Sequence, residues 1–367
     1  MSLSLTHLLL AVLTACFVGC DTATPESNHT HDHDHGGEVE SLKIVASVTD
    51  LGDLARAIGG EHVQVNTLAG SEVDPHYIAT TPDMVRQMAE ADLMLKVGAG
   101  MESDWLDELI SASNNDAVQP GGSGHFIAAD SLRRLADEEV DEVSVHPEGN
   151  PHFLLDPVEG VKVAARLRDA MSELHAESAA DFEANFAAFR DAVVTQLYGE
   201  TIATRIAAGE ADLADFAIAA EAGQEDTVLS GSSSQIGGQI AAFRQLRNPV
   251  AVGDHDLWPY FSRRYGIEMV GYMESSPGVE PTVRQLETLI SAMNERQVGV
   301  ILTAIFFDPR HGRFVSERTG AVVLDMAHQA GSRPDSETYL DMTRYNAELV
   351  FEAIRQAEQN AQAKEPA

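Results

Sequence analysis

The sequence contains very little cysteine. Cys16 and Cys20 are the only two, and both lie near the amino terminus. The rest of the chain therefore has no disulfide and no thiolate metal site. Basic residues are also scarce: 24 Lys and Arg stand against 58 Asp and Glu, which gives a formal charge of −34. Such a surface repels phosphate backbones, so we expect no nucleic-acid partner.

Long hydrophobic runs are almost absent. The one exception, LLLAVLTACFV at 8–18, is too short to span a bilayer as a helix. It is typical of the apolar part of a secretory signal. The small residue before Cys20 resembles a bacterial lipoprotein signal, so we predict a signal over 1–20, a lipid anchor on Cys20 and no other membrane contact. Lipidation at Cys16 and cleavage without a lipid remain as alternatives.

Residues 21–41 contain Pro, Ser, Asn, Thr and Gly and almost no apolar side chain, which predicts a disordered tether. A His-rich tract lies within it, formed by His29, His31, His33 and His35. Tracts of this kind bind transition metals loosely. We expect this tract to be an accessory collector of metal ions, because disordered ligands must be ordered on binding.

Strand-like apolar runs alternate with helical patterns from residue 42 onward and again after residue 247. The expected strands lie at 42–48, 63–69, 92–98 and near 126–131, and then at 248–254, 267–273, 298–306 and 321–326. Helical segments separate them, which indicates parallel sheets covered by helices. The predicted fold class is therefore α/β, with two lobes that each contain a mostly parallel sheet.

Between the two lobes the pattern predicts a long helix. No proline occurs between Pro157 and Pro249, and apolar residues follow helical spacing at Phe182, Phe186, Phe189, Val193 and Leu197. A helix over 158–199 would be roughly 60 Å long. SAAD at 178–181 resembles a helix start and could interrupt it. The expected domains are an N-terminal lobe at 42–157, a linking helix at 158–199 and a C-terminal lobe at 200–367.

Four residues in separate polar contexts are candidate metal ligands. They are His76 in VDPHYIATTPD, His152 in GNPHFLLDP, His255 in GDHDLWPYF and Asp325 in AVVLDMAHQAG. Several follow strands, and ligands collect outside the carboxyl ends of the strands in open α/β sheets. Three imidazoles and a carboxylate complete the tetrahedral shell of a zinc-like ion. Neighbouring carboxylates at Asp74, Asp254 and Asp256 are candidate hydrogen-bond acceptors for the imidazoles.

A zinc-dependent hydrolase is the alternative from another functional class. A catalytic zinc keeps one coordination position open for water and needs a general base nearby. Here a fourth protein ligand is available, and neither an HExxH motif nor a Ser or Cys nucleophile motif is present. We therefore expect a binding protein and not an enzyme.

Four of these segments also resemble a known family. VDPHYIATTPD, NPHFLLDP, HDLWPYFSRRYG and VVLDM…SETYLDMTRYN are similar, in order and spacing, to the solute-binding proteins of zinc and manganese ABC importers, the cluster A-I metal-binding lipoproteins. The resemblance implies two α/β lobes joined by one long rigid helix, with the metal between them. It also implies that His76, His152, His255 and Asp325 are the ligands.

The resemblance further implies an exported protein, periplasmic or anchored to the cell envelope, that delivers its metal to a permease and an ATPase. We expect a monomer that carries Zn²⁺, with Mn²⁺ or Fe²⁺ as the alternative cargo. A metal-storage lipoprotein or adhesin without a transporter would have the same fold. The chain departs from the family by carrying its His-rich tract in the tether instead of in the first lobe.

Overall fold

The computed structural model describes residues 41–132, 149–274 and 279–364. The predicted signal, Cys16, Cys20 and the four histidines of the tether lie outside these residues. No helix among the residues described is long and apolar enough to cross a membrane.

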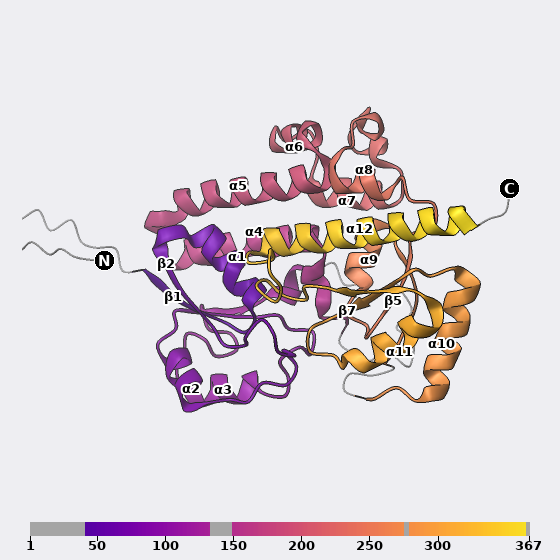
Figure 1. Cartoon of the computed structure of the whole chain (residues 1–367). Coiled ribbons are helices and arrows are strands. Elements are labelled where there is room, and N and C mark those ends of the chain that lie inside the picture. The colour runs from indigo at the N-terminus through magenta and orange to yellow at the C-terminus, as the bar shows by residue number, and fades with distance from the viewer. Residues whose placement is uncertain (1–40, 133–148, 275–278, 365–367) are drawn as a thin grey trace, which may run out of the picture. The chain divides into compact units, whose positions relative to one another are not determined.

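Two four-stranded parallel sheets form the framework of the protein (Figure 1). The first has the order β2-β1-β3-β4, and the second has the equivalent order β6-β5-β7-β8. The strands are β1 (Leu42–Ala46), β2 (Val63–Thr67), β3 (Leu93–Lys96), β4 (His125–Ile127), β5 (Val250–Gly253), β6 (Glu268–Tyr272), β7 (Val300–Thr303) and β8 (Val322–Asp325). All eight expected strands are confirmed, and so is the prediction of two α/β lobes.

Helices cover both faces of each sheet. The α-helices are α1 (Thr49–Gly59), α2 (Pro82–Ala89), α3 (Leu106–Ser113), α4 (Pro157–Leu174), α5 (Ala179–Tyr198), α6 (Glu200–Ala207), α7 (Leu213–Glu221), α8 (Gly238–Phe243), α9 (Pro259–Tyr265), α10 (Val283–Arg296), α11 (Pro309–Thr319) and α12 (Tyr339–Lys364). Short 3-10 helices are η1 (Gly60–His62), η2 (Ala128–Ser131), η3 (His152–Leu155), η4 (Ala176–Ser178), η5 (Glu225–Thr227) and η6 (Ser232–Ser234).

The hydrophobic core is shared on one side of the sheets and divided on the other. Side chains of β1 and β3 and of β5, β7 and β8 pack with α1, α4, α5, α9 and α12 in one continuous cluster. On the opposite faces, α2 and α3 cover the first sheet in one cluster, and α10 and α11 cover the second in another. Figure 1 shows these separate layers below the sheets. The lobes are therefore joined through a common core on one side only.

The connection between the lobes differs from the single helix expected over 158–199. That segment forms two helices, α4 and α5, which pack against each other. The chain leaves the helical conformation at His175 (φ −142°, ψ 67°), whose Nδ1 lies 3.0 Å from the Ser178 hydroxyl. The hairpin buries the apolar stripe, including Phe182 and Phe186, against α4, whereas a single rod would leave much of it exposed.

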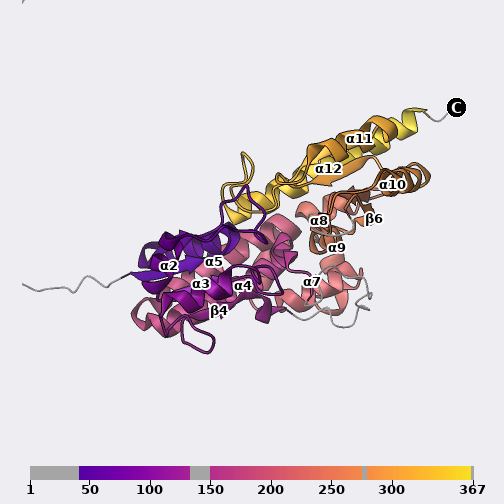
Figure 2. The ribbon, with the colours of Figure 1, turned by 90° about the horizontal axis from the view of Figure 1, so that it is seen from below.

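Helix α5 contacts elements of both lobes. Near its start, Asn185 donates a hydrogen bond to the Ile58 carbonyl at the end of α1. Near its end, Gln196 donates to Thr343 of α12, and the helix also contacts α8. Figure 1 shows α5 running from the α1 side towards α6 and α8, and Figure 2 gives the view from below. The segment expected as one linking helix is thus helical over 157–174 and over 179–198, and the prediction of a continuous helix over 158–199 is wrong.

Three helices begin with the same short sequence motif, a capping residue followed by proline. Thr81, Asp156 and Asp308 are the N-caps, and each accepts a hydrogen bond from a backbone N–H of the first turn. The proline that follows sits at the first helical position, where its missing N–H is not needed. TPD, DP and DP in the sequence therefore fix where α2, α4 and α11 start.

Asp156 also forms a buried ion pair across the protein. Its two carboxylate oxygens accept hydrogen bonds from the Arg264 Nε and Nη2 of α9, both at 2.8 Å. The Arg264 guanidinium in addition lies 2.7 Å from Glu221 of α7. These carboxylates raise the pKa of Arg264 well above its ordinary value, although burial opposes them. The pair fixes the start of α4 to α9 and so joins the segment after His152 to the second lobe.

We predict that Asp156→Asn will lower the free energy of unfolding of the metal-free protein by about 3 kcal/mol, because it removes the fully buried carboxylate that pairs with Arg264 and leaves only Glu221 beside that charge. Asparagine can still cap α4. The loss of unfolding free energy therefore reports the missing carboxylate charge and not a missing helix cap. Urea unfolding measures the effect. Glu268→Gln, which breaks the exposed pair with Arg296, is the control and should cost less than about 1 kcal/mol. Equal losses in the two variants would contradict the prediction.

Candidate metal centre

The loop that carries His76 is held by contacts on both sides of the histidine. The Asp74 carboxylate accepts a hydrogen bond from the His76 backbone N–H at 3.0 Å. The Trp105 indole N–H donates to the Pro75 carbonyl, also at 3.0 Å. Trp105 belongs to the MESDWL segment before α3, so the first turn of that helix positions the DPH motif.

His152 lies at the start of η3 and is buried. The side chain of Asn150 accepts a hydrogen bond from the His152 N–H at 2.9 Å and donates to the Asp256 carbonyl at 2.9 Å. Asn150 thus ties the segment of His152 to the residue that follows His255. The rings of His152 and His76 meet edge to face, with their centroids 5.6 Å apart.

His255 follows β5 and is held by Asp254. The Asp254 carboxylate accepts hydrogen bonds from the backbone N–H groups of His255 (2.8 Å) and Ala304 (2.5 Å). It also accepts one from the Trp258 indole at 3.0 Å. These bonds join the carboxyl ends of β5 and β7. Burial raises the pKa of Asp254 to about 7, against the effect of the hydrogen bonds.

The first lobe contains an equivalent buried acid. Glu102 accepts hydrogen bonds from the Ser47 hydroxyl after β1 and from the backbone N–H groups of Val97 and Gly98 after β3. Burial raises the pKa of Glu102 too. In each lobe, one buried carboxylate therefore holds the carboxyl ends of the two central strands together.

Asp325 ends β8, as expected, and its side chain is exposed. Its fractional exposure is 75%, and the Arg333 guanidinium lies 3.6 Å from the carboxylate. The Tyr345 hydroxyl donates a hydrogen bond to the Asp325 carbonyl at 2.9 Å. The backbone of Asp325 is thus anchored to α12, while its side chain is paired at the surface.

The four candidate ligands are brought together only in part. The structure places His76 against His152 and ties the segment of His152 to that of His255. Within the described parts of the chain, no three of the four have ligand atoms within 4.8 Å of one another. The carboxylates expected beside the imidazoles have other contacts. Asp74 and Asp254 accept from the histidine main chains, and Asp256 interacts with Asn150 and Tyr272.

Burial favours the neutral form of the His76 imidazole. It lowers the pKa of His76, against the opposing effects of Asp74, Asp104 and a hydrogen bond with the Met101 backbone. A neutral imidazole is the form that binds a metal ion. The site therefore favours the metal-binding form of His76 near neutral pH.

His328, three residues beyond Asp325, belongs to the same junction but could not be assigned from the sequence. It is 6% exposed, and its Nε2 lies 3.4 Å from the Val73 carbonyl in the loop of His76. Its ring meets that of Phe306 edge to face at 4.7 Å. The only signal in the sequence was its closeness to Asp325.

The segment around His328 is the main contact between the strand-end loops of the two lobes. Gln329 and Ala330 accept hydrogen bonds from Thr49, and the Ala330 N–H donates to the buried Asp50 carboxylate at 2.6 Å. Ser71 donates to the Gly331 carbonyl. The loops at the carboxyl ends of the two sheets therefore meet. This agrees with the expectation that ligands bind outside the carboxyl ends of the strands.

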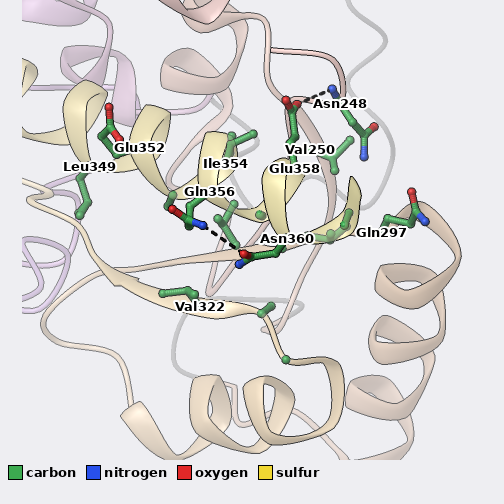
Figure 3. Close-up of a pocket in the computed structure, with 18 of the residues that line it drawn as sticks. Asn248, Val250, Gln297, Val322, Leu349, Glu352, Ile354, Gln356, Glu358 and Asn360 are labelled. Atoms are coloured by element: carbon green, nitrogen blue, oxygen red, sulfur yellow. Dashed lines mark hydrogen bonds between the residues drawn. The ribbon is translucent and has the colours of Figure 1, made fainter. Parts of the chain in front are cut away.

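One cavity among the described residues lies elsewhere. It has a volume of about 1340 Å³ and sits between α12 and the amino ends of β5, β7 and β8, where Val250, Val322 and Leu349 line it (Figure 3). None of the candidate metal ligands lines it. Its position at the opposite end of the strands separates it from the histidines.

Two lobes with equivalent parallel sheets and histidines at their junction define a class, the metal-binding substrate-binding proteins of ABC importers. These proteins act outside the cytoplasm and are not enzymes. Residues 44–224 and 202–353 match the family described as the periplasmic component A of the zinc-uptake complex, ZnuA. The match covers most of the chain, and the protein belongs to this family.

Individual relatives are distant. The chain is 23% identical to the manganese-binding lipoprotein MntA of Halalkalibacterium halodurans, over 95% of this chain and 97% of the relative. Among solved structures it is similar to a crystal structure of ZnuA (20% identity, TM-score 0.63, 86% and 100% coverage). It is also similar to the periplasmic zinc-binding protein TroA of Treponema pallidum (18%, 0.63, 86% and 99%). The fold is thus shared with proteins named for zinc and for manganese.

We predict that His328 makes the metal-free protein less stable in acid. Burial lowers its pKa to about 4, below the ordinary value near 6.5. The unfolded chain therefore takes up the proton first, and stability is lost as the pH falls from about 6.5 to 4. The loss is up to about 3 kcal/mol, since each pKa unit corresponds to about 1.4 kcal/mol.

The measurement is urea unfolding of the wild type and of His328→Gln with a chelator present, from pH 7.5 to pH 4. The wild type should be the more stable at pH 7.5, and the difference should shrink in acid. The wild type must be compared with His328→Gln because other groups also change the stability with pH. Burial raises the pKa of Asp50 and of Asp254 to about 7, and their protonation stabilises the fold as the pH falls. A difference independent of pH would contradict the assignment.

Proposed function

We propose that the protein captures Zn²⁺ at the junction of its lobes and delivers it to the permease and ATPase of an ABC importer. The ligands proposed are His76, His152, His255 and Asp325. The observation that carries the proposal is the edge-to-face contact of His76 and His152, 5.6 Å between ring centroids, beside the Asn150–Asp256 link to the segment of His255.

The donor set supports zinc as the cargo. Imidazole nitrogens and a carboxylate oxygen suit Zn²⁺, although they also accept Mn²⁺ or Fe²⁺. Three nitrogens and one oxygen complete a tetrahedral shell, the arrangement that Zn²⁺ adopts in closed sites. A fully occupied shell leaves no position for a reacting water, which fits a carrier.

Asp325 must move for this shell to form. Strands β5 and β8 are separated by β7, so their ends lie about 10 Å apart. The Asp325 side chain is 75% exposed and lies 3.6 Å from Arg333, a long and partly solvated pair that costs little to break. We propose that metal binding draws the Asp325 carboxylate from Arg333 towards the histidines, with a shift of the loop that follows β8.

The amino-terminal segment has an accessory role in this proposal. His29, His31, His33 and His35 would collect metal ions loosely near the membrane. A lipid on Cys20 would anchor the protein to the cell envelope, and the folded part would act as a monomer. The same chemistry would serve a protein that carries Mn²⁺, as the name of the relative MntA indicates for that protein.

We predict that the metal-free protein binds Zn²⁺ at least about tenfold more tightly than Mn²⁺, because three imidazoles favour zinc in the order of divalent-metal affinities. Isothermal titration with each metal gives the two dissociation constants. Deleting residues 29–35 should reduce the number of zinc ions bound without changing the tight dissociation constant. Equal constants, or a preference for Mn²⁺, would contradict zinc as the cargo.

We also predict that His152→Ala weakens tight zinc binding by at least about 100-fold, since a lost metal ligand costs several kcal/mol. His62→Gln is the control, because the His62 side chain is largely buried but is paired with Asp181 of α5, away from the candidate ligands. Its dissociation constant should match that of the wild type. An unchanged constant in His152→Ala would remove this residue from the metal centre.

A further inference from the structure

A second group of metal-ligating side chains lies in the C-terminal lobe, apart from the four residues proposed above. Glu280 precedes α10, Asp308 caps α11 and His311 lies in the first turn of α11. One ligand atom from each lies within 4.8 Å of the other two. This is the one such group of three or more found among the residues described.

The side chains offer suitable donors for a divalent ion. Two carboxylates and one imidazole are the mixed oxygen and nitrogen set that first-row metals such as Zn²⁺ and Mn²⁺ accept. The His311 Nε2 is buried and has no hydrogen-bond partner among the described residues. Tetrahedral bonds of about 2.1 Å place ligand atoms about 3.4 Å apart, so small side-chain rotations would complete the set.

Arg310 now occupies the place of a cation in this group. Its guanidinium donates to the Asp308 carboxylate at 2.7 Å and lies 3.6 Å from Glu280. The side chain is 68% exposed, so it can turn to solvent at little cost. The two carboxylates already bind the Arg310 guanidinium and can bind a divalent ion in its place. Competition from Arg310 lowers the affinity of the site for that ion.

The group lies on the same edge of the second sheet as His255. Asp308 directly follows Phe307, whose ring centroid is 5.7 Å from that of His255. Both segments follow the carboxyl ends of neighbouring strands, β7 and β5. A cation held there would be close to the proposed transport site without sharing a ligand with it.

We propose that Glu280, Asp308 and His311 form a second, weaker site for a first-row divalent cation. Its ligands differ from those of the proposed zinc centre, so a substitution in one site removes no ligand from the other. Arg310 competes with the cation, and the site fills only after the tight centre. Because the site is at the surface, we expect its bound ion to exchange rapidly with ions in solution.

The test uses the full chain and Zn²⁺ alone, with bound ions counted by equilibrium dialysis over a range of free zinc. Asp308→Asn combined with His311→Gln should bind one weak ion fewer than the wild type. Asparagine keeps the cap of α11, so the helix is retained. Arg310→Gln should tighten the weak ion about tenfold, because it removes a positive charge near the divalent one.

The control is Glu287→Gln, which removes one exposed negative charge from α10 without touching the group. It should bind the same number of ions as the wild type. An unchanged count in the double variant, or a weaker ion in Arg310→Gln, would overturn the second site. His152→Ala distinguishes the two proposals, because it should lose the tight ion and keep the weak one.

Discussion

The ion pair between Asp156 and Arg264 is the constraint on which the arrangement of the lobes depends. Both side chains are buried, and the two hydrogen bonds of 2.8 Å fix the start of α4 against α9. Taking two charges out of water is costly, and only good geometry with further hydrogen bonds offsets that cost. Here the Tyr198 hydroxyl and Glu221 supply additional partners for Arg264. The pair therefore specifies one position of the NPHFLLDP segment relative to the second lobe.

That position brings the candidate imidazoles together. His152 lies four residues before Asp156, in the short helix that leads into α4. Tyr339 of α12 reinforces the segment by donating to the Leu154 carbonyl at 2.7 Å. His76 then meets His152 ring to ring, and Asn150 reaches the loop of His255. Because the lobes share a continuous core on the side of α4, α5 and α12, large rotation between them would disrupt packing. Movement on metal binding should be confined to the loops at the strand ends.

Much of the fold could be predicted from the sequence because its strands are short apolar runs separated by clear helix signals. The caps at Thr81, Asp156 and Asp308 mark helix starts with a side chain and a proline, a purely local signal. The break after α4 was harder to predict, since no proline or glycine marks it. His175 and Ser178 end the helix through a contact between side chains, and the hairpin forms because both apolar stripes become buried.

The site could be predicted in part for a similar reason. Motifs in order predicted His76, His152 and His255 as ligands, and the structure places His76 against His152 and ties the segment of His152 to that of His255. The exposure of Asp325 and its pairing with Arg333 depend on the tertiary position of the loop after β8, which no local pattern encodes. The role of His328 as a contact to the loop of His76 has the same origin. Likewise, Asp74 and Asp254 hold backbone N–H groups, a distinction that residue types alone cannot make.

The central claim is that one metal ion binds at the junction through both lobes. A crystal structure of the zinc-loaded protein, with anomalous diffraction recorded at the zinc absorption edge, tests it most directly. The account predicts the strongest anomalous peak about 2.0–2.2 Å from donor atoms of His76, His152, His255 and Asp325, with Asp325 separated from Arg333. A strongest peak coordinated by residues of one lobe alone would contradict it.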